Sequence, residues 1–221
     1  MDIHEIETSL ENPDFQYRLK AISALKDYTP EIAVPLLKAK LNDPEFLVRS
    51  FVSRGFGQQQ NAESFAALLQ IMKFDNTPNV RAEAANALSL FGRFAASHLV
   101  VTFVQDDHWL VRRSIIAALI DMECYSELLE VCIEALAGED MTTQEAAVDA
   151  LGALAGTNQE QPALSQLLTL ANSEYENMRW HVASALKRFD HPQAKEVLIQ
   201  LRQDPNHRVV AAALEDLLDR S

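Results

Sequence analysis

The sequence repeats one pattern with a period of about 31 residues, and this repeat constrains the fold more than any other feature. An arginine recurs at one position of the pattern, and Gln144 and Val210 replace it in two copies. Successive positions lie 31 or 32 residues apart, except for one interval of 35 before Arg179. These seven positions, called the Arg positions below, are Arg18, Arg49, Arg81, Arg112, Gln144, Arg179 and Val210. Seven copies therefore account for all 221 residues.

Apolar residues keep constant distances from the Arg position and predict two helices in each copy. Three residues after it, the chain has Ala21, Val52, Ala84, Ile115, Ala147, Val182 and Ala213. Seven residues after it, the chain has Leu25, Phe56, Leu88, Leu119, Leu151, Leu186 and Leu217. Twelve residues before it, the chain has Ile6, Leu37, Leu69, Val100, Cys132, Leu167 and Leu198. Each copy is therefore expected to form a helical hairpin that can bury its apolar face only against its neighbours.

Stacked hairpins build an all-α fold, an α-solenoid with a right-handed superhelix of about seven two-helix repeats. We expect one domain over residues 1–221. An Asp or Asn begins most copies, and we expect it to be the N-cap of the second helix. Gly55 and Gly57 predict a short or frayed second helix in the second copy, since glycine weakens helices. The composition of residues 156–162 predicts a longer loop before the sixth copy.

The composition restricts the partners. A formal net charge of −13 argues against nucleic acid and against anionic membrane surfaces, which attract clustered Lys and Arg. We expect no membrane association, because no apolar run is long enough to span a bilayer. The first residues lack the basic and apolar regions of a signal peptide, so we expect a cytoplasmic protein. The acidity favours partners that carry basic patches.

Motifs for catalysis, metals or cofactors are not found, and we expect none of these groups. The sequence has no nucleophile elbow, Gly-rich phosphate loop, HExxH or CxxC motif. Asp106, Asp107 and His108 suggest a metal site, but capping and the helix dipole account for the two acids. Cys132 occupies an apolar position and is expected to be buried, whereas Cys124 falls in a turn and is expected to be partly exposed. The pattern favours a protein that is not an enzyme.

The Arg column and the recurrent acids predict a ladder of ion pairs between repeats. Positions one, two and five residues after the Arg position turn away from the core, on the helices expected to line the concave wall. Residue types that anchor interfaces occur there, and we predict a partner or ligand site on this face. Its residues are Phe51, Arg54, Glu83, Asn86, Arg113, Trp180 and His181.

Aromatic residues also recur three positions before the Arg position. They are Phe15, Phe46 and Trp109. At the start of a helix such rings can cover the end of the neighbouring hairpin, in the manner of a hydrophobic staple. We favour this packing role for the three rings over a role in binding.

Two stretches carry a family resemblance. Residues 43–52 and 79–88 resemble the short HEAT-like repeats named for the phycobilisome lyases, and the likeness extends over nearly the whole chain. The group includes phycobilisome lyase subunits, the phycobilisome degradation protein NblB and a protein associated with iron–sulfur assembly. The single stack of seven units is most similar to the NblB side of the group. No catalytic motif of the family is legible in the chain.

The resemblance implies a cytoplasmic cyanobacterial scaffold that binds a protein client, a phycobiliprotein in phycobilisome assembly or degradation. A bilin lyase or chromophore-detaching factor is the first alternative. In that reading, Arg54 or Arg113 would pair with bilin propionates while Phe51 or Trp180 would stack on the rings. An adaptor in iron–sulfur cluster assembly is the second alternative.

Overall fold

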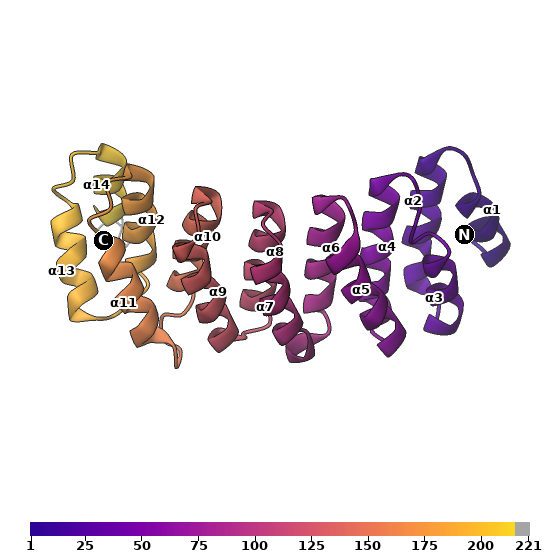
Figure 1. Cartoon of the computed structure of the whole chain (residues 1–221), viewed down its shortest axis with the longest axis horizontal. Helices are drawn as coiled ribbons and strands as arrows, with labels where there is room; N and C mark the ends of the chain where they lie inside the picture. The colour runs from indigo at the N-terminus through magenta and orange to yellow at the C-terminus, as the bar shows by residue number, and fades with distance from the viewer. Residues whose placement is uncertain (215–221) are drawn as a thin grey trace. The chain divides into compact units, whose positions relative to one another are not determined.

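The computed structural model describes residues 1–214, and this part of the chain is entirely helical (Figure 1). It contains fourteen α-helices, two short 3-10 helices and no strand. The prediction of an all-α protein built from helical hairpins is therefore confirmed. None of the helices within residues 1–214 is both long and apolar enough to cross a bilayer.

Each repeat supplies one odd-numbered and one even-numbered helix, called its first and second helix. The first helices are α1 (Ile3–Leu10), α3 (Pro30–Lys38), α5 (Ala62–Phe74), α7 (Ala96–Gln105), α9 (Tyr125–Ala137), α11 (Glu160–Leu170) and α13 (Pro192–Leu201). The second helices are α2 (Phe15–Ala24), α4 (Phe46–Gln59), α6 (Pro78–Ser89), α8 (Trp109–Asp121), α10 (Met141–Gly152), α12 (Glu176–Leu186) and α14 (His207–Leu214). The 3-10 helices are η1 (Leu25–Asp27) and η2 (Gly92–Ala95). The expected seven hairpins are all present in the described residues.

The contacts divide the chain into two compact units, Met1–Met122 and Glu123–Ser221, and each is described by itself. Unit 1 holds α1 to α8, and the described part of unit 2 holds α9 to α14. The single domain over residues 1–221 and the right-handed superhelix stay predictions.

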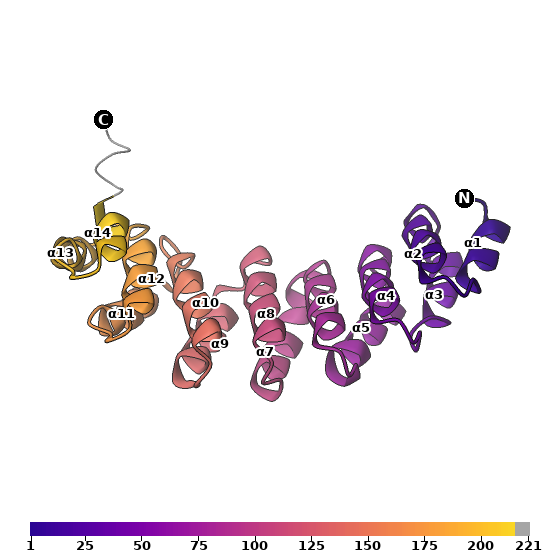
Figure 2. The ribbon, with the colours of Figure 1, turned by 90° about the horizontal axis from the view of Figure 1, so that it is seen from above.

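Both units have two layers of helices (Figure 2). Within each unit, consecutive second helices pack closely on one another, while consecutive first helices touch much less. Small residues such as Ala84 and Ala147 are fully buried and let the second helices approach. Each unit is thus a stack of hairpins, the arrangement of an α-solenoid.

The predicted core of the second helices is confirmed over the described residues. The side chains three residues after the Arg position are at most 1% exposed in all seven repeats. The side chains at the position seven residues after the Arg position are completely buried in the first six repeats. Leu217, the seventh of that set, lies outside the described residues.

The predicted core of the first helices needs a correction in two repeats. Ile6, Leu37 and Cys132 are completely buried as expected. Leu69 and Val100 are only half-buried, and the preceding residues, Leu68 and Leu99, are the buried ones. In both repeats the buried residue of the first helix lies thirteen instead of twelve positions before the Arg position.

The predicted N-caps of the second helices are wrong. Asp43, Asp75 and Asp106 precede the N-cap residues Glu45, Thr77 and His108 by two positions, and Asp204 precedes His207, the first residue of α14, by three. Each of these aspartates instead accepts the backbone N–H of the residue two ahead, at 2.8–3.0 Å. They therefore form Asx turns that end the inter-helix connection before the helix begins.

The predicted short helix at Gly55 and Gly57 is also wrong. Helix α4 runs over 14 residues, from Phe46 to Gln59. A Cβ atom on Gly55 would lie 2.7 Å from Leu37 Cδ2, and one on Gly57 would lie 3.0 Å from Ala87 Cβ. The two glycines therefore permit close contact with neighbouring helices, and tertiary packing outweighs their low helix propensity.

The long connection before the sixth repeat is present but lies earlier than predicted, at residues 153–159 between α10 and α11. Turns extend to Gln159, and Gly156 adopts a φ of +73°, which favours glycine. Residues 160–162 belong to α11, because Glu160 begins this helix. The Glu160 carboxylate accepts the N–H of Gly156 at 2.6 Å and ties the turn to the helix.

Candidate functional site

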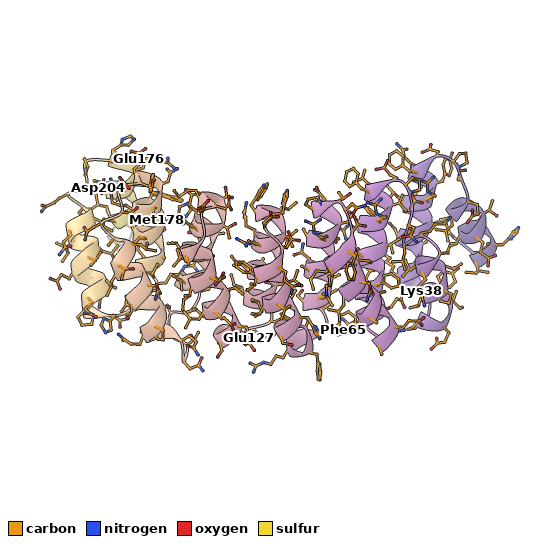
Figure 3. The ribbon with its side chains drawn as sticks, in the orientation of Figure 1. Lys38, Phe65, Glu127, Glu176, Met178 and Asp204 are labelled. Atoms are coloured by element: carbon orange, nitrogen blue, oxygen red, sulfur yellow. The ribbon has the colours of Figure 1, made fainter. Side chains whose placement is uncertain are left out.

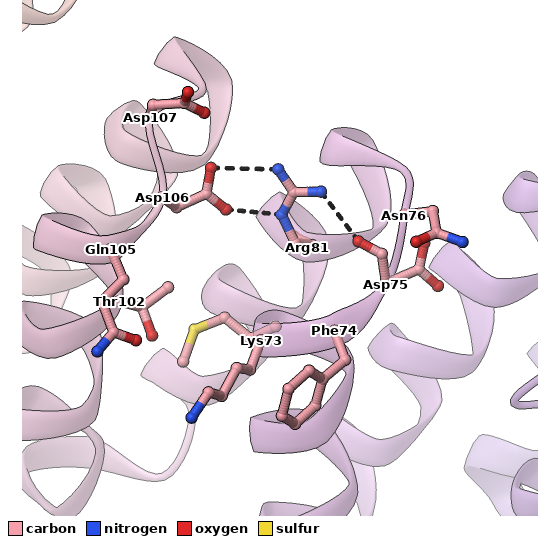
Figure 4. A pocket seen from close by; sticks show the side chains of 10 residues that line it. Lys73, Phe74, Asp75, Asn76, Arg81, Thr102, Gln105, Asp106 and Asp107 are labelled. Carbon is pink, nitrogen blue, oxygen red and sulfur yellow. Dashed lines mark hydrogen bonds and ion pairs between the residues drawn. The ribbon is translucent and has the colours of Figure 1, made fainter.

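The Arg column forms the predicted ladder of ion pairs between repeats. Arg18 pairs with Asp43, Arg49 with Asp75, Arg81 with Asp106, and Arg179 with Asp204, each through two nitrogen–oxygen contacts of 2.6–3.1 Å. The same arginines also donate to the backbone carbonyl six residues earlier. Figure 4 shows this arrangement for Arg81, which joins Asp106 to the Asp75 backbone.

The ladder pairs are largely buried. The Asp43 and Asp204 side chains are each only 4% exposed. The hydrogen bond from Arg179 holds the pKa of Asp204 below its ordinary value, and in return Asp204 raises the pKa of Arg179. Asp204 lies at the end of unit 2 where α12 and α14 begin (Figure 3). These ion pairs stabilise the stack. Both carboxylate oxygens of Asp43 and of Asp204 already accept hydrogen bonds from the paired arginine.

Shallow hollows line the ladder at three turns. The largest, of about 410 Å³, lies between Lys73, Phe74 and Asp107 (Figure 4). Hollows of about 320 and 310 Å³ lie beside Arg49 and Arg179 at the equivalent positions of other repeats. Because the hollow recurs with the repeat, it is a consequence of stacking and identifies no specific pocket.

Three of the predicted site residues meet on the second helices of unit 1. The guanidinium of Arg54 lies 5.2 Å from the centre of the Phe51 ring, and both residues are on α4. Arg54 Nε donates to Glu83 Oε1 on α6 at 2.9 Å, and this contact raises the pKa of Arg54. The Arg54 side chain remains 55% exposed. The three groups form a flat cationic and aromatic surface that is held in place across two repeats.

Asn86 and Arg113 lie beside this group without joining it. Asn86 is exposed on α6, in line with the prediction. Arg113 is exposed on α8, and its guanidinium lies 5.8 Å from the centre of the Trp109 ring. No ion-pair partner of Arg113 occurs among residues 1–214. Arg113 thus offers a cation to a partner of unit 1.

Trp180 and His181 belong to a separate cluster in unit 2. His181 Nδ1 lies 2.7 Å from Asp149 Oδ1, and its Nε2 lies 3.8 Å from Glu145 Oε2. The Trp180 ring meets the His181 ring edge-on at 4.6 Å, and Arg208 stacks over Trp180 at 5.6 Å. The cluster joins α10, α12 and α14, and it presents aromatic, cationic and acidic groups together.

The two clusters share one geometric rule. Arg54 and Asp149 each lie five residues after their Arg position, and their partners Glu83 and His181 each lie two residues after the next one. A side chain five residues after one Arg position therefore contacts the side chain two residues after the Arg position of the following repeat. Sequence reasoning missed this pairing and also missed Arg208, which lies two residues before its Arg position on the same exposed side.

Comparison with known families agrees with the repeat and the fold. The sequence matches HEAT repeats over residues 5–89, 34–120 and 129–219. The chain belongs to the HEAT-repeat family. Among curated proteins, none matches the sequence at a significant level.

Solved structures of several proteins share the HEAT-repeat fold. YibA of Escherichia coli has a TM-score of 0.60 at 15% identity, covering 100% of this chain and 93% of its own. The complex of CpcE and CpcF of phycocyanin lyase from Nostoc sp. has a TM-score of 0.53 at 19% identity, covering 100% of this chain and 88% of its own. Human deoxyhypusine hydroxylase has a TM-score of 0.50 at 18% identity, covering 98% of this chain and 94% of its own. At these identities the likeness shows the fold alone.

In this HEAT-repeat protein, the Asp106, Asp107 and His108 group is not arranged as a metal site. Asp106 is engaged by Arg81, and His108 Nδ1 accepts the backbone N–H of Leu110 as the N-cap of α8. The His108 ring stacks on Trp109 at 5.9 Å. Within residues 1–214, no group of three or more His, Cys, Asp or Glu side chains is placed to hold a metal ion.

The cysteines of the HEAT-repeat protein are both buried. Cys132 is completely buried, as predicted, and burial raises its pKa to about 12. Cys124 is 4% exposed, so the prediction of a partly exposed thiol is wrong. It is the residue just before α9, where its side chain packs inward. Neither thiol is presented to solvent as a nucleophile.

The recurrent aromatic residues Phe15, Phe46 and Trp109 are the first residues of α2, α4 and α8. Phe46 is 38% exposed and Trp109 is 41% exposed. These two rings therefore pack only in part against the neighbouring hairpin, less completely than expected. Trp109 contributes its remaining surface to the exposed side of α8, next to Arg113.

Proposed function

We propose that this HEAT-repeat protein is a cytoplasmic scaffold that binds a protein client through the exposed side of its second helices, and that the client is a phycobiliprotein. The observation that carries the proposal is the pair of clusters around Arg54 and Trp180. Neither cluster is needed for the core, and both combine aromatic and cationic groups of the kind that anchor interfaces. Repeat proteins commonly use such continuous surfaces to bind clients.

The choice of client rests on two similarities. The repeats resemble those named for the phycobilisome lyases, and a complex of phycocyanin lyase subunits shares the fold. The single seven-repeat stack favours the NblB side of that group, with a role in phycobilisome assembly or degradation in a cyanobacterium. Within residues 1–214 the clusters hold no nucleophile next to a base, which favours binding over catalysis.

The test is co-elution of the purified protein with phycocyanin in size-exclusion chromatography. Arg113→Ala and Trp180→Ala should each weaken the complex, by about tenfold or more if the side chain is an anchor worth over 1.4 kcal/mol. The matched control is Lys73→Ala, which removes a cation that lies 5.3 Å from the Phe74 ring but belongs to the first helix α5. The control should bind like the wild type.

Three outcomes would count against the proposal. The absence of any complex with the wild type would reject the phycobiliprotein client. Equal weakening by Lys73→Ala would reject the second helices as the binding side. A large fall in melting temperature of Trp180→Ala would show that Trp180 is a packing residue, so circular dichroism is measured on every variant.

A second candidate function is the handling of the bilin itself, and the geometry of Arg113 favours it. This exposed cation stands over Trp109 without a carboxylate partner in residues 1–214, so it could receive a propionate while the ring stacks on a pyrrole. Titration with free phycocyanobilin should then change the visible absorbance, and Arg113→Ala should abolish the change. No observation favours the iron–sulfur adaptor.

A further inference from the structure

The outer side of α7 is an apolar strip without a charged residue. The exposed residues of this helix are Ser97, His98, Val101, Val104 and Gln105. Val101 and Val104 are 55% and 56% exposed, while Leu99 and Phe103 on the opposite side are completely buried. Two valines therefore stand on the exposed side of the helix among Ser97, His98 and Gln105, although only the opposite side faces the core. An apolar side of this kind is the common mark of an interaction surface.

Phe94 extends the strip toward the N-terminus. It is 85% exposed, the highest exposure among the large apolar residues of the described chain. It lies seven residues before Val101, and Ala95 and Ala96 between them have right-handed helical backbone angles. Seven residues are close to two helical turns, so Phe94 and Val101 lie on the same side. Phe65 of α5 packs edge-on against the rings of Phe91 and His98, and these contacts fix the position of both rings (Figure 3 labels Phe65).

Opposite charges flank the strip. Arg93 is exposed just before Phe94, and Asp107 is exposed two residues after the end of α7. Neither takes part in an ion pair among residues 1–214, whereas Asp106 is already engaged by Arg81. A cation at the N-terminus and an anion at the C-terminus are the unfavourable arrangement for the dipole of a single helix. An antiparallel partner helix with the same pattern would place each charge beside its opposite.

We propose that a second copy of this chain covers the strip, and that the α7 helices of two copies pack antiparallel about a two-fold axis. The required pairs are Arg93 with Asp107, Phe94 with Val104, and His98 with Val101 of the other copy. The midpoint of the two residue numbers in each pair lies at 99 to 100. A single two-fold axis that passes near residue 100 of both helices therefore forms all three pairs. This self-complementarity is the condition for a closed, two-fold dimer interface.

The size of the strip sets the expected strength. Helix α7, residues 96–105, extends about 15 Å, at about 1.5 Å per residue, and Asp107 follows it in a non-helical stretch. One helix of this length covers less than the roughly 800 Å² per partner of a standard stable interface. The dimer should therefore be weak, with a dissociation constant in the micromolar range, and should depend on concentration.

The experiment is sedimentation velocity of the full chain from about 1 to 200 µM, a range that includes micromolar dissociation constants. The wild type should shift from monomer to dimer as its concentration rises. Val104→Glu should raise the dissociation constant by about tenfold or more, because two acidic groups would enter the apolar strip. Ile199→Glu is the matched control, since Ile199 is also 56% exposed but lies on α13 in unit 2.

A charge exchange tests the antiparallel register. Arg93→Asp and Asp107→Arg should each weaken the dimer, and the double variant should restore it toward the wild type. A monomeric wild type at every concentration would overturn the proposal. So would equal effects of Val104→Glu and Ile199→Glu, or a double variant that is weaker than both single variants. Circular dichroism of each variant separates a lost interface from a lost fold, and none of these variants alters the proposed client surface.

Discussion

Gly57 marks a close approach between α4 and α6, two neighbouring second helices of unit 1. A Cβ atom at this position would lie 3.0 Å from Ala87 Cβ and 3.3 Å from the Ala87 Cα on α6. The second contact is with backbone, which cannot turn aside as a flexible side chain can. The absence of a side chain is therefore a packing requirement at this residue, even though glycine disfavours helices in general.

Gly57→Ala should destabilise the protein by about 1–3 kcal/mol, the usual cost of overpacking a well-filled core. Helix propensity alone predicts the opposite sign, a gain of about 1 kcal/mol. Urea unfolding followed by circular dichroism decides between the two. Gln58→Ala, at the exposed neighbouring position, is the control and should change stability by less than about 0.5 kcal/mol. A stabilised Gly57→Ala variant would contradict the packing argument.

At the scale of helices and turns, the ladder links hairpins through the turn before the second helix, at three junctions of unit 1 and at one of unit 2. The aspartate of a turn closes an Asx turn with its backbone contact and also receives the arginine of the preceding repeat. One carboxylate therefore shapes the connection and sets the spacing between repeats. Its burial makes the loss of either partner costly, by about 3–5 kcal/mol for a buried pair.

Unit 2 lacks one such link, between its first two repeats. Gln144 keeps the contact with the carbonyl six residues earlier, since its Nε2 donates to Gly138 O at 2.7 Å. Ser173 keeps the turn, since its Oγ accepts the backbone N–H of Tyr175 at 3.3 Å. What is missing is the charged pair itself, because neither residue carries a charge.

Gln144→Arg with Ser173→Asp should restore the missing link. We expect the double variant to be more stable than the sum of the single variants predicts, with a coupling energy of about 1–3 kcal/mol in a double-mutant cycle. The free energies of unfolding of the four proteins give this value. The exposed pair Arg54 and Glu83 serves as comparison, and its coupling should not exceed about 1 kcal/mol. Zero coupling between residues 144 and 173 would mean that the two turns of unit 2 are spaced differently from those of unit 1.

At the scale of the whole molecule, the two units differ in how fully the ladder is built. Unit 1 has a charged pair at each of its three junctions between repeats, whereas the described part of unit 2 has one pair for two junctions. In a repeat protein, stability is close to a sum over repeats and their nearest-neighbour contacts. Local stability should therefore differ between the units.

Hydrogen exchange should reveal this difference. Backbone amides of α10 in unit 2 should exchange faster than those of α6 in unit 1, because the α6 repeat is linked on both sides by charged pairs. Mass spectrometry of peptides from the two helices measures the rates, and the Gln144→Arg, Ser173→Asp variant should slow exchange in α10 but not in α6. Equal protection of α6 and α10 in the wild type would contradict the nearest-neighbour account.

The candidate surface was only partly predictable from the sequence. Phe51, Arg54, Arg113, Trp180 and His181 were predicted as site residues because they occupy positions that the repeat does not require for its core, and their role in binding stays a prediction. Their partners could not be found in this way. The reach from one repeat to the next depends on the spacing and rotation of the helices, which the period of the sequence does not contain. The exposed apolar residues of α7 were not predicted either, because the repeat pattern identifies inward positions and does not say what the other positions face.

The sequence by itself determined the seven copies of the repeat, the helical hairpins and the inward residues of the second helices. Periodic burial is a local property, and the pattern of apolar residues records it directly. Only the tertiary structure decided that the recurrent aspartates close Asx turns instead of capping helices. It also decided that Gly57 serves close packing and that the predicted surface separates into a cluster in each unit. These features depend on distances between side chains of different repeats, and such distances arise only when the hairpins stack.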